Sequence, residues 1–329
     1  MKWLGLVLLV GGASLGLTGA CNDGQKPSVG LSEPLRVAGG QFFSGPLPGA
    51  PAGTTVAGEP TVTNVAVATN IISPGLARLG FDGRTTSDAA TVAVRFADLG
   101  SGYWVFVLSG ADSQFPGELS WHADISFNSD FASQAGKHAM TFVAIDANGN
   151  AGQQYAMNVC LESKVPDNLH TCAPDQRPPD AVISLAWDEN VDIDLEVVTP
   201  DFRTVDGKHP TTEFADGGTD GCTPPAQGGC PAPGAGYVDR DSLLECIPDG
   251  LREEDLVWNT RPTGTFDIYV NLFDACAKPG ASWILTVYEA QGDMPNRSLV
   301  PMQVFKGRVA AVEANGGAAL GTFIYSYSF

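Results

Sequence analysis

The sequence has few basic residues and lacks the motifs that identify common enzyme classes. Its 329 residues include 18 lysines and arginines against 37 aspartates and glutamates, a formal net charge of −19. This balance argues against nucleic-acid binding, because phosphates require a basic face. Charged residues make up only 17% of the chain, too few for a coiled coil. No H-E-x-x-H, P-loop or dinucleotide-binding motif occurs, and G-x-S-x-G is found only at Gly12–Gly16, inside the apolar N-terminal run. We therefore expect a non-enzymatic protein without a nucleic-acid partner.

Metal-binding patterns built on nitrogen and sulfur are also missing. The chain has four histidines, which lie far apart, and no C-x-x-C pair. A zinc site, which is usually built from such residues, is therefore not expected. Beyond residue 17, no apolar run approaches the roughly 20 residues that cross a bilayer.

The N-terminus has the three parts of a secretory signal peptide. Lys2 precedes the apolar run Trp3–Leu17, and small residues lead to Cys21. The sequence Leu-Thr-Gly-Ala-Cys resembles a bacterial lipoprotein signal, in which the cysteine is lipidated. Ordinary cleavage between Ala20 and Cys21 is the alternative. The chain has seven cysteines, and lipidation of Cys21 would leave an even number for disulfides. We expect a signal peptide at 1–20 and a lipoprotein.

The lipid would make the membrane the first partner of the chain. Asn22 follows the cysteine, which by resemblance to enterobacterial sorting signals favours the outer membrane. The expected location is therefore the cell envelope, on the periplasmic or outer surface. Residues 21–56 are rich in glycine and proline and are expected to form a flexible tether. In an alternative interpretation, Leu35–Phe43 contributes a first edge strand.

Short alternating runs predict an all-β protein with two antiparallel β-sandwich domains. Residues 57–164 are expected to form the first domain and 181–329 the second, with a linker at 165–180. In the first domain, runs of β type separated by turn residues favour a sandwich. These runs are Thr61–Val67, Ala90–Phe96, Tyr103–Leu108, Leu119–Phe127 and His138–Ala144.

The end of the first domain contains a possible calcium loop. His138–Gly152 resembles the closing hairpin of bacterial Ig-like domains. Within it, Asp146-Ala-Asn-Gly-Asn150 has alternating oxygen-bearing residues but lacks the continuation of an EF-hand. A solvated turn between two strands is the preferred interpretation.

The second domain contains two pairs of acids at D-x-D spacing. Alternation places Asp192, Asp194 and Glu196 on one face of a strand, about 7 Å apart in steps of two residues. Asp239 and Asp241 repeat the spacing in Tyr237–Ser242. Two interpretations compete. In one, Asp192, Asp194, Asp239 and Asp241 form an oxygen site for Ca²⁺. In the other, these acids are the solvated face of a half-buried sheet.

Six cysteines remain after Cys21, and an oxidising compartment favours disulfides. Fifteen pairings are possible. We favour the local pairs Cys160–Cys172 and Cys222–Cys230, which leaves Cys246–Cys276 to join two strand ends.

The second domain resembles a known family. Trp187–Pro200 reads W-D-x-N-x-D-x-D-L-x-V-x-x-P, followed by D-R-D-S at Asp239–Ser242 and P-T-G-T-F-D-I-Y-V at Pro262–Val270. This order resembles the YfaP-like bacterial domains of unknown function. The resemblance implies a secreted or periplasmic β-sandwich and no activity.

Together these features predict a binding, adhesion or structural module of the cell envelope, with calcium as the candidate ion and an envelope protein or a glycan as the candidate partner. The alternative is a carbohydrate-binding or hydrolytic envelope protein that uses exposed carboxylates. Tryptophans such as Trp104, Trp121 and Trp258 would then supply a platform on which sugars stack.

Overall fold

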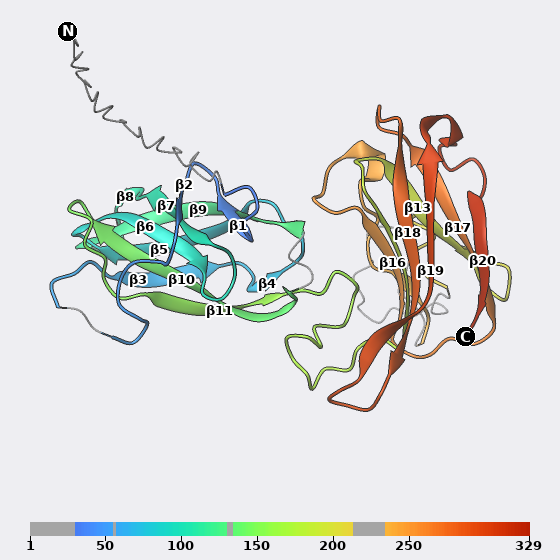
Figure 1. Cartoon of the computed structure of the whole chain (residues 1–329), viewed down its shortest axis with the longest axis horizontal. Coiled ribbons are helices and arrows are strands. Elements are labelled where there is room, and N and C mark those ends of the chain that lie inside the picture. Colours follow the sequence, from blue (N-terminus) through green and yellow to red (C-terminus); the bar gives the residue numbers. More distant parts are fainter. Residues whose placement is uncertain (1–29, 55–56, 130–133, 213–233) are drawn as a thin grey trace, which may run out of the picture.

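The chain folds into two β-sandwiches joined by the segment 162–180 (Figure 1). The computed structural model describes residues 30–54, 57–129, 134–212 and 234–329. These residues contain strands and short 3₁₀ turns, and no α-helix is found among them. Every strand pairing is antiparallel except that of β4 with β11. The all-β sandwich class predicted from the alternating runs is therefore confirmed.

The first sandwich packs a five-stranded sheet against a six-stranded sheet. One sheet has the order β1-β9-β5-β3, with β8 paired to β9, and the other has the order β2-β7-β6-β10-β11-β4. The strands are β1 (Leu35–Val37), β2 (Gln41–Ser44), β3 (Val62–Val67), β4 (Ile71–Ile72), β5 (Leu79–Thr86), β6 (Ala89–Phe96), β7 (Gly102–Val107), β8 (Gly110–Ala111), β9 (Glu118–Phe127), β10 (Gly136–Asp146) and β11 (Tyr155–Leu161).

Aromatic side chains fill the space between these two sheets. Trp121 of β9 stacks on Phe142 of β10, with 5.6 Å between ring centroids, and it also contacts Phe106 of β7. Gly83 of β5 leaves the room that the indole needs, because a Cβ atom there would lie 2.2 Å from the Trp121 ring. Glycine in this strand therefore permits a large side chain on its neighbour.

The expected tether is part of the first sandwich from Leu35 onward. Strand β1 pairs with β9, and β2 pairs with β7. Leu35 and Val37 are buried in the core. The prediction of a tether extending to residue 56 is therefore wrong for these strands, and the alternative in which Leu35–Phe43 contributes strand structure is correct. Burial of the two apolar side chains stabilises the segment despite its glycine-rich surroundings.

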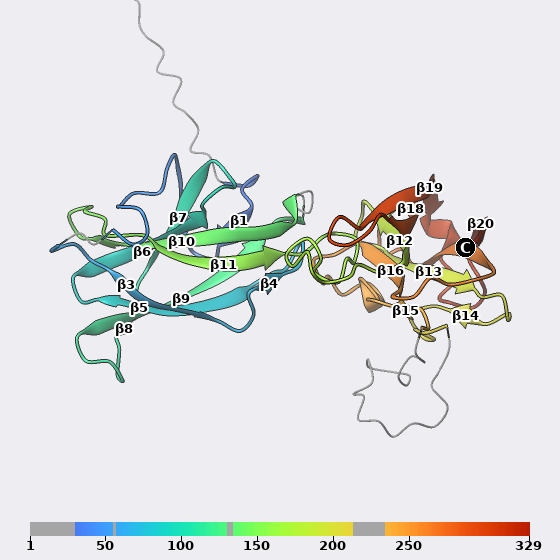
Figure 2. The ribbon, with the colours of Figure 1, turned by 90° about the horizontal axis from the view of Figure 1, so that it is seen from below.

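The second sandwich packs the sheet β15-β16-β12-β18-β19 against the sheet β14-β13-β17-β20 (Figures 1 and 2). Its strands are β12 (Ala181–Trp187), β13 (Asp192–Val198), β14 (Thr204–Val205), β15 (Tyr237–Val238), β16 (Glu253–Trp258), β17 (Thr265–Asp274), β18 (Gly280–Gln291), β19 (Ser298–Ala310) and β20 (Thr322–Ser328). The alternating apolar residues of β12, β13 and β17 face inward and form a continuous core.

The tryptophans of the described residues belong to the cores. Trp104, Trp121, Trp187, Trp258 and Trp283 are all buried. Trp258, for example, packs against Phe266 and Phe329. The proposed sugar-stacking platform is therefore wrong for Trp104, Trp121 and Trp258, because strand alternation turns their rings inward. No helix in the described part of the chain is long and apolar enough to cross a membrane.

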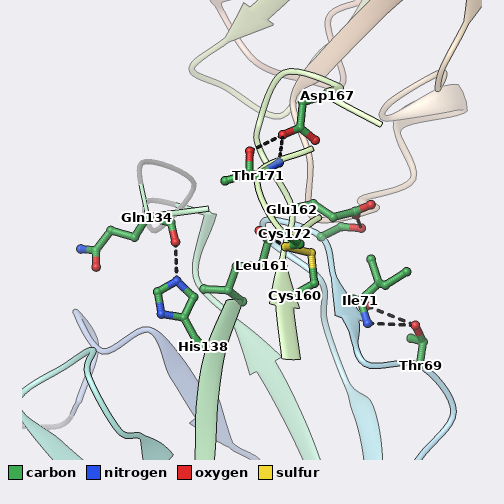
Figure 3. The surroundings of a disulfide bond; sticks show 11 residues. Thr69, Ile71, Gln134, His138, Cys160, Leu161, Glu162, Asp167, Thr171 and Cys172 are labelled. Atoms are coloured by element: carbon green, nitrogen blue, oxygen red, sulfur yellow. Dashed lines mark hydrogen bonds between the residues drawn. A yellow bond between two sulfur atoms is a disulfide. The ribbon is translucent and has the colours of Figure 1, made fainter. Parts of the chain in front are cut away.

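Two disulfides are present in the described residues. Cys160–Cys172 joins the end of β11 to the segment that leads toward the second sandwich (Figure 3). Cys246–Cys276 joins the residues before β16 to those after β17. Both are the pairs favoured from the sequence. Cys21 and the pair Cys222–Cys230 lie outside the described residues.

Candidate metal centre

Strand β13 carries acids on a face that is buried. Ile193, Leu195 and Val197 point into the core, so Asp192, Asp194 and Glu196 share the opposite face. Asp192 is 1% exposed and Glu196 is 5% exposed. The interpretation of this face as solvated is therefore wrong for these two residues. Loops from elsewhere in the second sandwich cover it.

Three carboxylates converge at the start of β13. Asp192, Asp194 and Asp241 each provide one oxygen, and these three oxygens lie within 4.8 Å of one another. Asp241 comes from the segment between β15 and β16. Its carboxylate lies against Gly207, where a Cβ atom would be 2.4 Å from Asp241 Oδ2. Glycine at this position therefore lets the carboxylate approach the backbone.

Glu254 reaches the same place from the other sheet. It lies on β16, on the face that also carries the core residues Leu256 and Trp258. Strands β13 and β16 lie side by side here (Figure 2), and the backbone N–H of Leu195 donates to Glu254 Oε2 at 2.7 Å. The Glu254 side chain is fully buried. One of its oxygens therefore bonds to an edge of β13, which leaves the other oxygen for a different partner.

Several oxygens of this site have no hydrogen-bond donor. Asp192 Oδ2 accepts the backbone N–H of Glu245 at 3.0 Å, but Asp192 Oδ1 has no partner. Asp241 Oδ1 and Glu254 Oε1 are likewise buried without a partner. Among the described residues, no lysine, arginine or histidine forms an ion pair with any of these carboxylates. Buried acceptors and charges of this kind are costly unless something compensates them.

The pKa values of the group reflect this burial. Burial and, to a smaller extent, the neighbouring charge of Asp241 raise the pKa of Asp192 to about 6. Burial together with the charges of Asp192 and Asp241 raises the pKa of Asp194 to about 8. Burial also raises the pKa of Asp241, and it raises that of Glu254 well above the ordinary value. A bound cation would favour the ionised forms and offset these costs.

The arrangement fits a hard divalent cation. All the available ligand atoms are carboxylate oxygens, which Ca²⁺ prefers at 2.3–2.6 Å. Two oxygens on opposite sides of one such ion are separated by about 5 Å, twice the bond length, and the three aspartate oxygens lie within 4.8 Å. Asp192, Asp194 and Asp241 could therefore share one ion, and Glu254 is near enough to interact electrostatically with all three.

The predicted ligand Asp239 does not join this group. Its Oδ2 accepts from the Arg240 guanidinium at 3.1 Å, which compensates its charge. Strand β15 ends at Val238, so the alternation that places two residues two apart on one face does not extend to Asp239 and Asp241. The inclusion of Asp239 among the ligands is therefore wrong.

Glu196 is also satisfied without a cation. Asn271 Nδ2 donates to Glu196 Oε1 at 3.0 Å, and the backbone N–H of Gly321 donates to Oε2 at 2.7 Å. These bonds connect β13 to β17 and to the residue before β20. Glu196 therefore has a structural role at the next step along the same face.

Two other groups of acids differ from the β13 site. Cys246, Asp274 and Cys276 also lie within 4.8 Å of one another, but the two sulfurs form a disulfide and supply no thiolate. Glu253 and Asp255 point to the other face of β16, where Ser184 Oγ donates to Glu253 at 3.1 Å. Burial raises the pKa of both acids, and the charge of Arg240 partly offsets this effect. This pair therefore has a nearby counter-charge.

The segment at Asp146 forms a turn, which was the interpretation preferred from the sequence over a calcium loop. Asp146 Oδ1 accepts the backbone N–H groups of Asn148 and Asn150, both at 2.8 Å. Asp146 Oδ2 accepts their side-chain amides at 3.4 and 2.9 Å. Four donors therefore engage the carboxylate, which is the pattern of a side-chain-stabilised turn rather than of a calcium loop.

Replacing Asp146 by alanine is expected to lower the melting temperature slightly and to leave calcium binding unchanged. The hydrogen bond from the Asn150 side chain contributes most to holding the pKa of Asp146 below its ordinary value, so this contribution to stability is present above pH 4 and is lost on acidification. Thermal melts at pH 7.5 and calcium titration calorimetry would check both points. Loss of a calcium-binding event in this variant would contradict the assignment of the turn.

Glu254 was not predicted from the sequence, although a signal was present. Glu253-Glu254-Asp255 runs directly into the apolar Leu256-Val257-Trp258. The period of a strand places Glu254 on the face of Leu256 and Trp258, so a core-facing Trp258 would have implied a core-facing carboxylate. The strand period does not reveal that Glu254 on β16 would face β13 of the other sheet.

Comparisons with known proteins give no family. No protein-family model matches the chain, and no curated protein matches it. Solved structures similar to the chain include the C-terminal domain of the Streptococcus agalactiae AgI/II polypeptide BspA, at 8% identity and a TM-score of 0.19. That match covers 75% of this chain and 98% of the other chain. A second structure, titled BspA_C_WT, has the same identity, coverage and TM-score.

Proposed function

We propose that the protein is a non-enzymatic binding or structural module of the cell envelope, whose second sandwich is stabilised by one bound Ca²⁺ ion. The observation that carries this proposal is the group formed by Asp192, Asp194 and Asp241, with the buried Glu254 beside it. Three of its oxygens lie within 4.8 Å of one another, and Asp192 and Glu254 each keep a buried oxygen without a donor. A single cation would bind the three aspartates and offset the charge of Glu254 beside them.

The position of the ion favours a stabilising role. Asp192 and Asp194 belong to one sheet, and Glu254 belongs to the other. An ion held between them would join the two sheets at the side where β13 and β16 meet. Because the unfolded chain does not preserve such a site, the free energy of binding adds to the free energy of unfolding.

The described residues give little support to the alternative of a carbohydrate-binding or hydrolytic protein. It relied on exposed carboxylates and tryptophans. The acids of β13 and β16 are mostly buried, and so are five tryptophans. A buried carboxylate without access for substrate does not serve as a general acid or nucleophile for a glycan.

The envelope location is part of the proposal and rests on residues 1–22. We propose that the signal peptide directs export and that Cys21 receives a lipid, which anchors the chain to the outer membrane. The second sandwich is then a YfaP-like module carried by this anchor. Metabolic labelling with a palmitate analogue would test the anchor. We expect labelling of the unmodified chain and none after Cys21→Ala, and labelling of the variant would contradict this part of the proposal.

Calcium titration calorimetry of the full chain at pH 7.5 tests the ion. We expect one binding event per chain, and we expect Asp194→Asn or Asp241→Asn to weaken it at least about tenfold, or about 1.4 kcal/mol, because each change removes a charged ligand. Asp239→Asn is the matched control. It lies two residues from Asp241 but pairs with Arg240, so it should keep the affinity. Absence of binding to the unmodified chain would refute the proposal.

A further inference from the structure

The Cys246–Cys276 disulfide lies beside the proposed calcium site. Asp241 and Cys246 are five positions apart in the segment that precedes β16. Between them, the backbone N–H of Glu245 donates to Asp192 Oδ2 at 3.0 Å. The segment that supplies one ligand therefore also holds the carboxylate of another.

The other end of the disulfide is attached to the same part of the sheet. Cys276 follows β17, whose last residue Asp274 is paired in register with Asp192. Asp274 Oδ1 also accepts the backbone N–H of Cys276 at 2.7 Å. The disulfide thus joins the segment carrying Asp241 to the strand end next to Asp192.

The backbone of residues 243–246 adopts a conformation that surrounding contacts or a covalent bond must hold in place. Leu243, Glu245 and Cys246 have φ angles of 65°, 53° and 62°. These values lie in the left-handed region, which residues other than glycine adopt only when surrounding contacts impose it. Leu243 is anchored in the core, and the disulfide supplies a covalent anchor at the other end of the turn. Without it, local contacts alone would have to keep Asp241 within reach of the ion.

We propose that the Cys246–Cys276 disulfide controls the affinity of the calcium site, so that reduction of this bond weakens calcium binding. This inference rests on the proposed function, because it concerns the same site. A dithiol reductant transfers two electrons and two protons to the disulfide. The S–S bond breaks, two cysteine thiols form, and the reductant becomes a disulfide. The turn at 244–246 then loses its covalent anchor, and the backbone N–H of Glu245 no longer holds the Asp192 carboxylate in place.

The two disulfides differ in their access to such a reductant. Cys160 is 8% exposed and Cys172 is 5% exposed, whereas Cys246 and Cys276 are only partly buried. Because disulfide exchange requires a thiolate to reach a sulfur atom, the bond at the calcium site should be reduced first.

Calcium binding and reduction of the disulfide are thermodynamically linked, so each must affect the other. If the oxidised protein binds calcium more tightly than the reduced protein, then calcium must favour the oxidised protein by the same factor. For a two-electron couple, each tenfold factor lowers the reduction potential by about 30 mV. Calcium is therefore expected to protect this bond against reduction.

Calcium titration of the full chain would test the inference directly. We expect the double variant Cys246→Ser with Cys276→Ser to bind calcium at least about tenfold more weakly than the unmodified chain. The matched control is Cys160→Ser with Cys172→Ser, which removes the disulfide of the first sandwich and should keep the affinity. If the unmodified chain binds calcium and the first double variant binds equally well, the inference is refuted while the proposed function stands. If the unmodified chain does not bind, the proposed function itself fails.

A redox titration of the unmodified chain makes the test independent of whether the variant folds. The midpoint potential of the Cys246–Cys276 bond would be measured in dithiothreitol buffers, with EDTA or with millimolar calcium, by mass spectrometry of alkylated peptides. We expect calcium to lower this potential by about 30 mV or more and to leave that of Cys160–Cys172 unchanged. Equal potentials in the two solutions would overturn the inference.

Discussion

Glu254→Gln is expected to raise the melting temperature of the chain in EDTA and to reduce the further rise that calcium produces. In the absence of an ion, Glu254 is fully buried next to Asp194, and burial raises its pKa well above the ordinary value. Folding without calcium therefore has to place a proton on this group or bury its charge. Glutamine avoids both costs, and its side-chain oxygen can still accept from the backbone N–H of Leu195.

The same substitution should reduce the response to calcium. For the unmodified chain, an ion at one hundred times its dissociation constant adds about 2.7 kcal/mol to the free energy of unfolding. For a unit of about 150 residues this corresponds to a rise of about 5–10 °C. Glutamine provides a neutral oxygen in place of a charged one, so the affinity and the shift both decrease.

Glu253→Gln is the matched control for this experiment. Glu253 is adjacent in sequence and equally buried, but it points to the opposite face of β16 and accepts from Ser184. We expect this variant to keep the calcium shift. Differential scanning calorimetry of both variants, with EDTA and with millimolar calcium, distinguishes the two positions. A full calcium shift in Glu254→Gln would show that Glu254 is not a ligand.

In EDTA, the free energy of unfolding is expected to fall as the pH rises from about 4 to 8. Burial raises the folded-state pKa of Asp192 to about 6 and that of Asp194 to about 8, against 3.8 in the unfolded chain. Between these values the folded state binds more protons than the unfolded state, so stability decreases with increasing pH. Asp192 alone contributes about 3 kcal/mol across its window, at 1.36 kcal/mol for each unit of pKa shift.

Acids with lowered pKa values make the free energy of unfolding rise with pH, but they do so below pH 4 and not between pH 4 and 8. The backbone hydrogen bond from Ser282 holds the pKa of Asp188 below its ordinary value. For Asp180, burial acts to raise the pKa, but the hydrogen bonds and charges of Arg177 and Arg297 outweigh it and lower the pKa. Their contributions to stability are complete above pH 4 and are lost below it. The decline from pH 4 to about 6 therefore reports on the acids with raised pKa values; above that, His122, whose pKa is raised chiefly by its hydrogen bond with Asp82, adds to the decline.

Calcium should reverse this dependence on pH. The ion binds the ionised carboxylates, so raising the pH strengthens binding while it weakens the protein without the ion. Urea denaturation at pH 5, 6.5 and 8, with EDTA and with calcium, would measure both slopes. Asp194→Asn should flatten the EDTA profile, because it removes a group whose folded-state pKa is about 8. A stability in EDTA that increases from pH 5 to pH 8 would contradict this account of the buried acids.

The positions of the strands could largely be predicted from the sequence, with informative exceptions. The alternating runs at Ala90–Phe96 and Leu119–Phe127 became β6 and β9. Strand β5 was missed because Leu79–Thr86 contains two glycines, an aspartate and an arginine among few apolar residues. Its central position in the sheet depends on Trp121, which fills the space over Gly83. Packing across the sandwich, and not local preference, selects this strand.

Which residues share a face of a strand could be read from the alternation of residues along the chain. A period of two is a property of the extended backbone, so Asp192 and Asp194 necessarily point the same way. The groups that lie over that face depend on the three-dimensional fold. It brought Asp241 to these residues, paired Asp239 with Arg240, and added Glu254 from a strand that begins more than fifty residues later. Local geometry sets the direction of a side chain, whereas the partners it meets depend on how distant strands and loops pack, and that packing leaves no local period in the sequence.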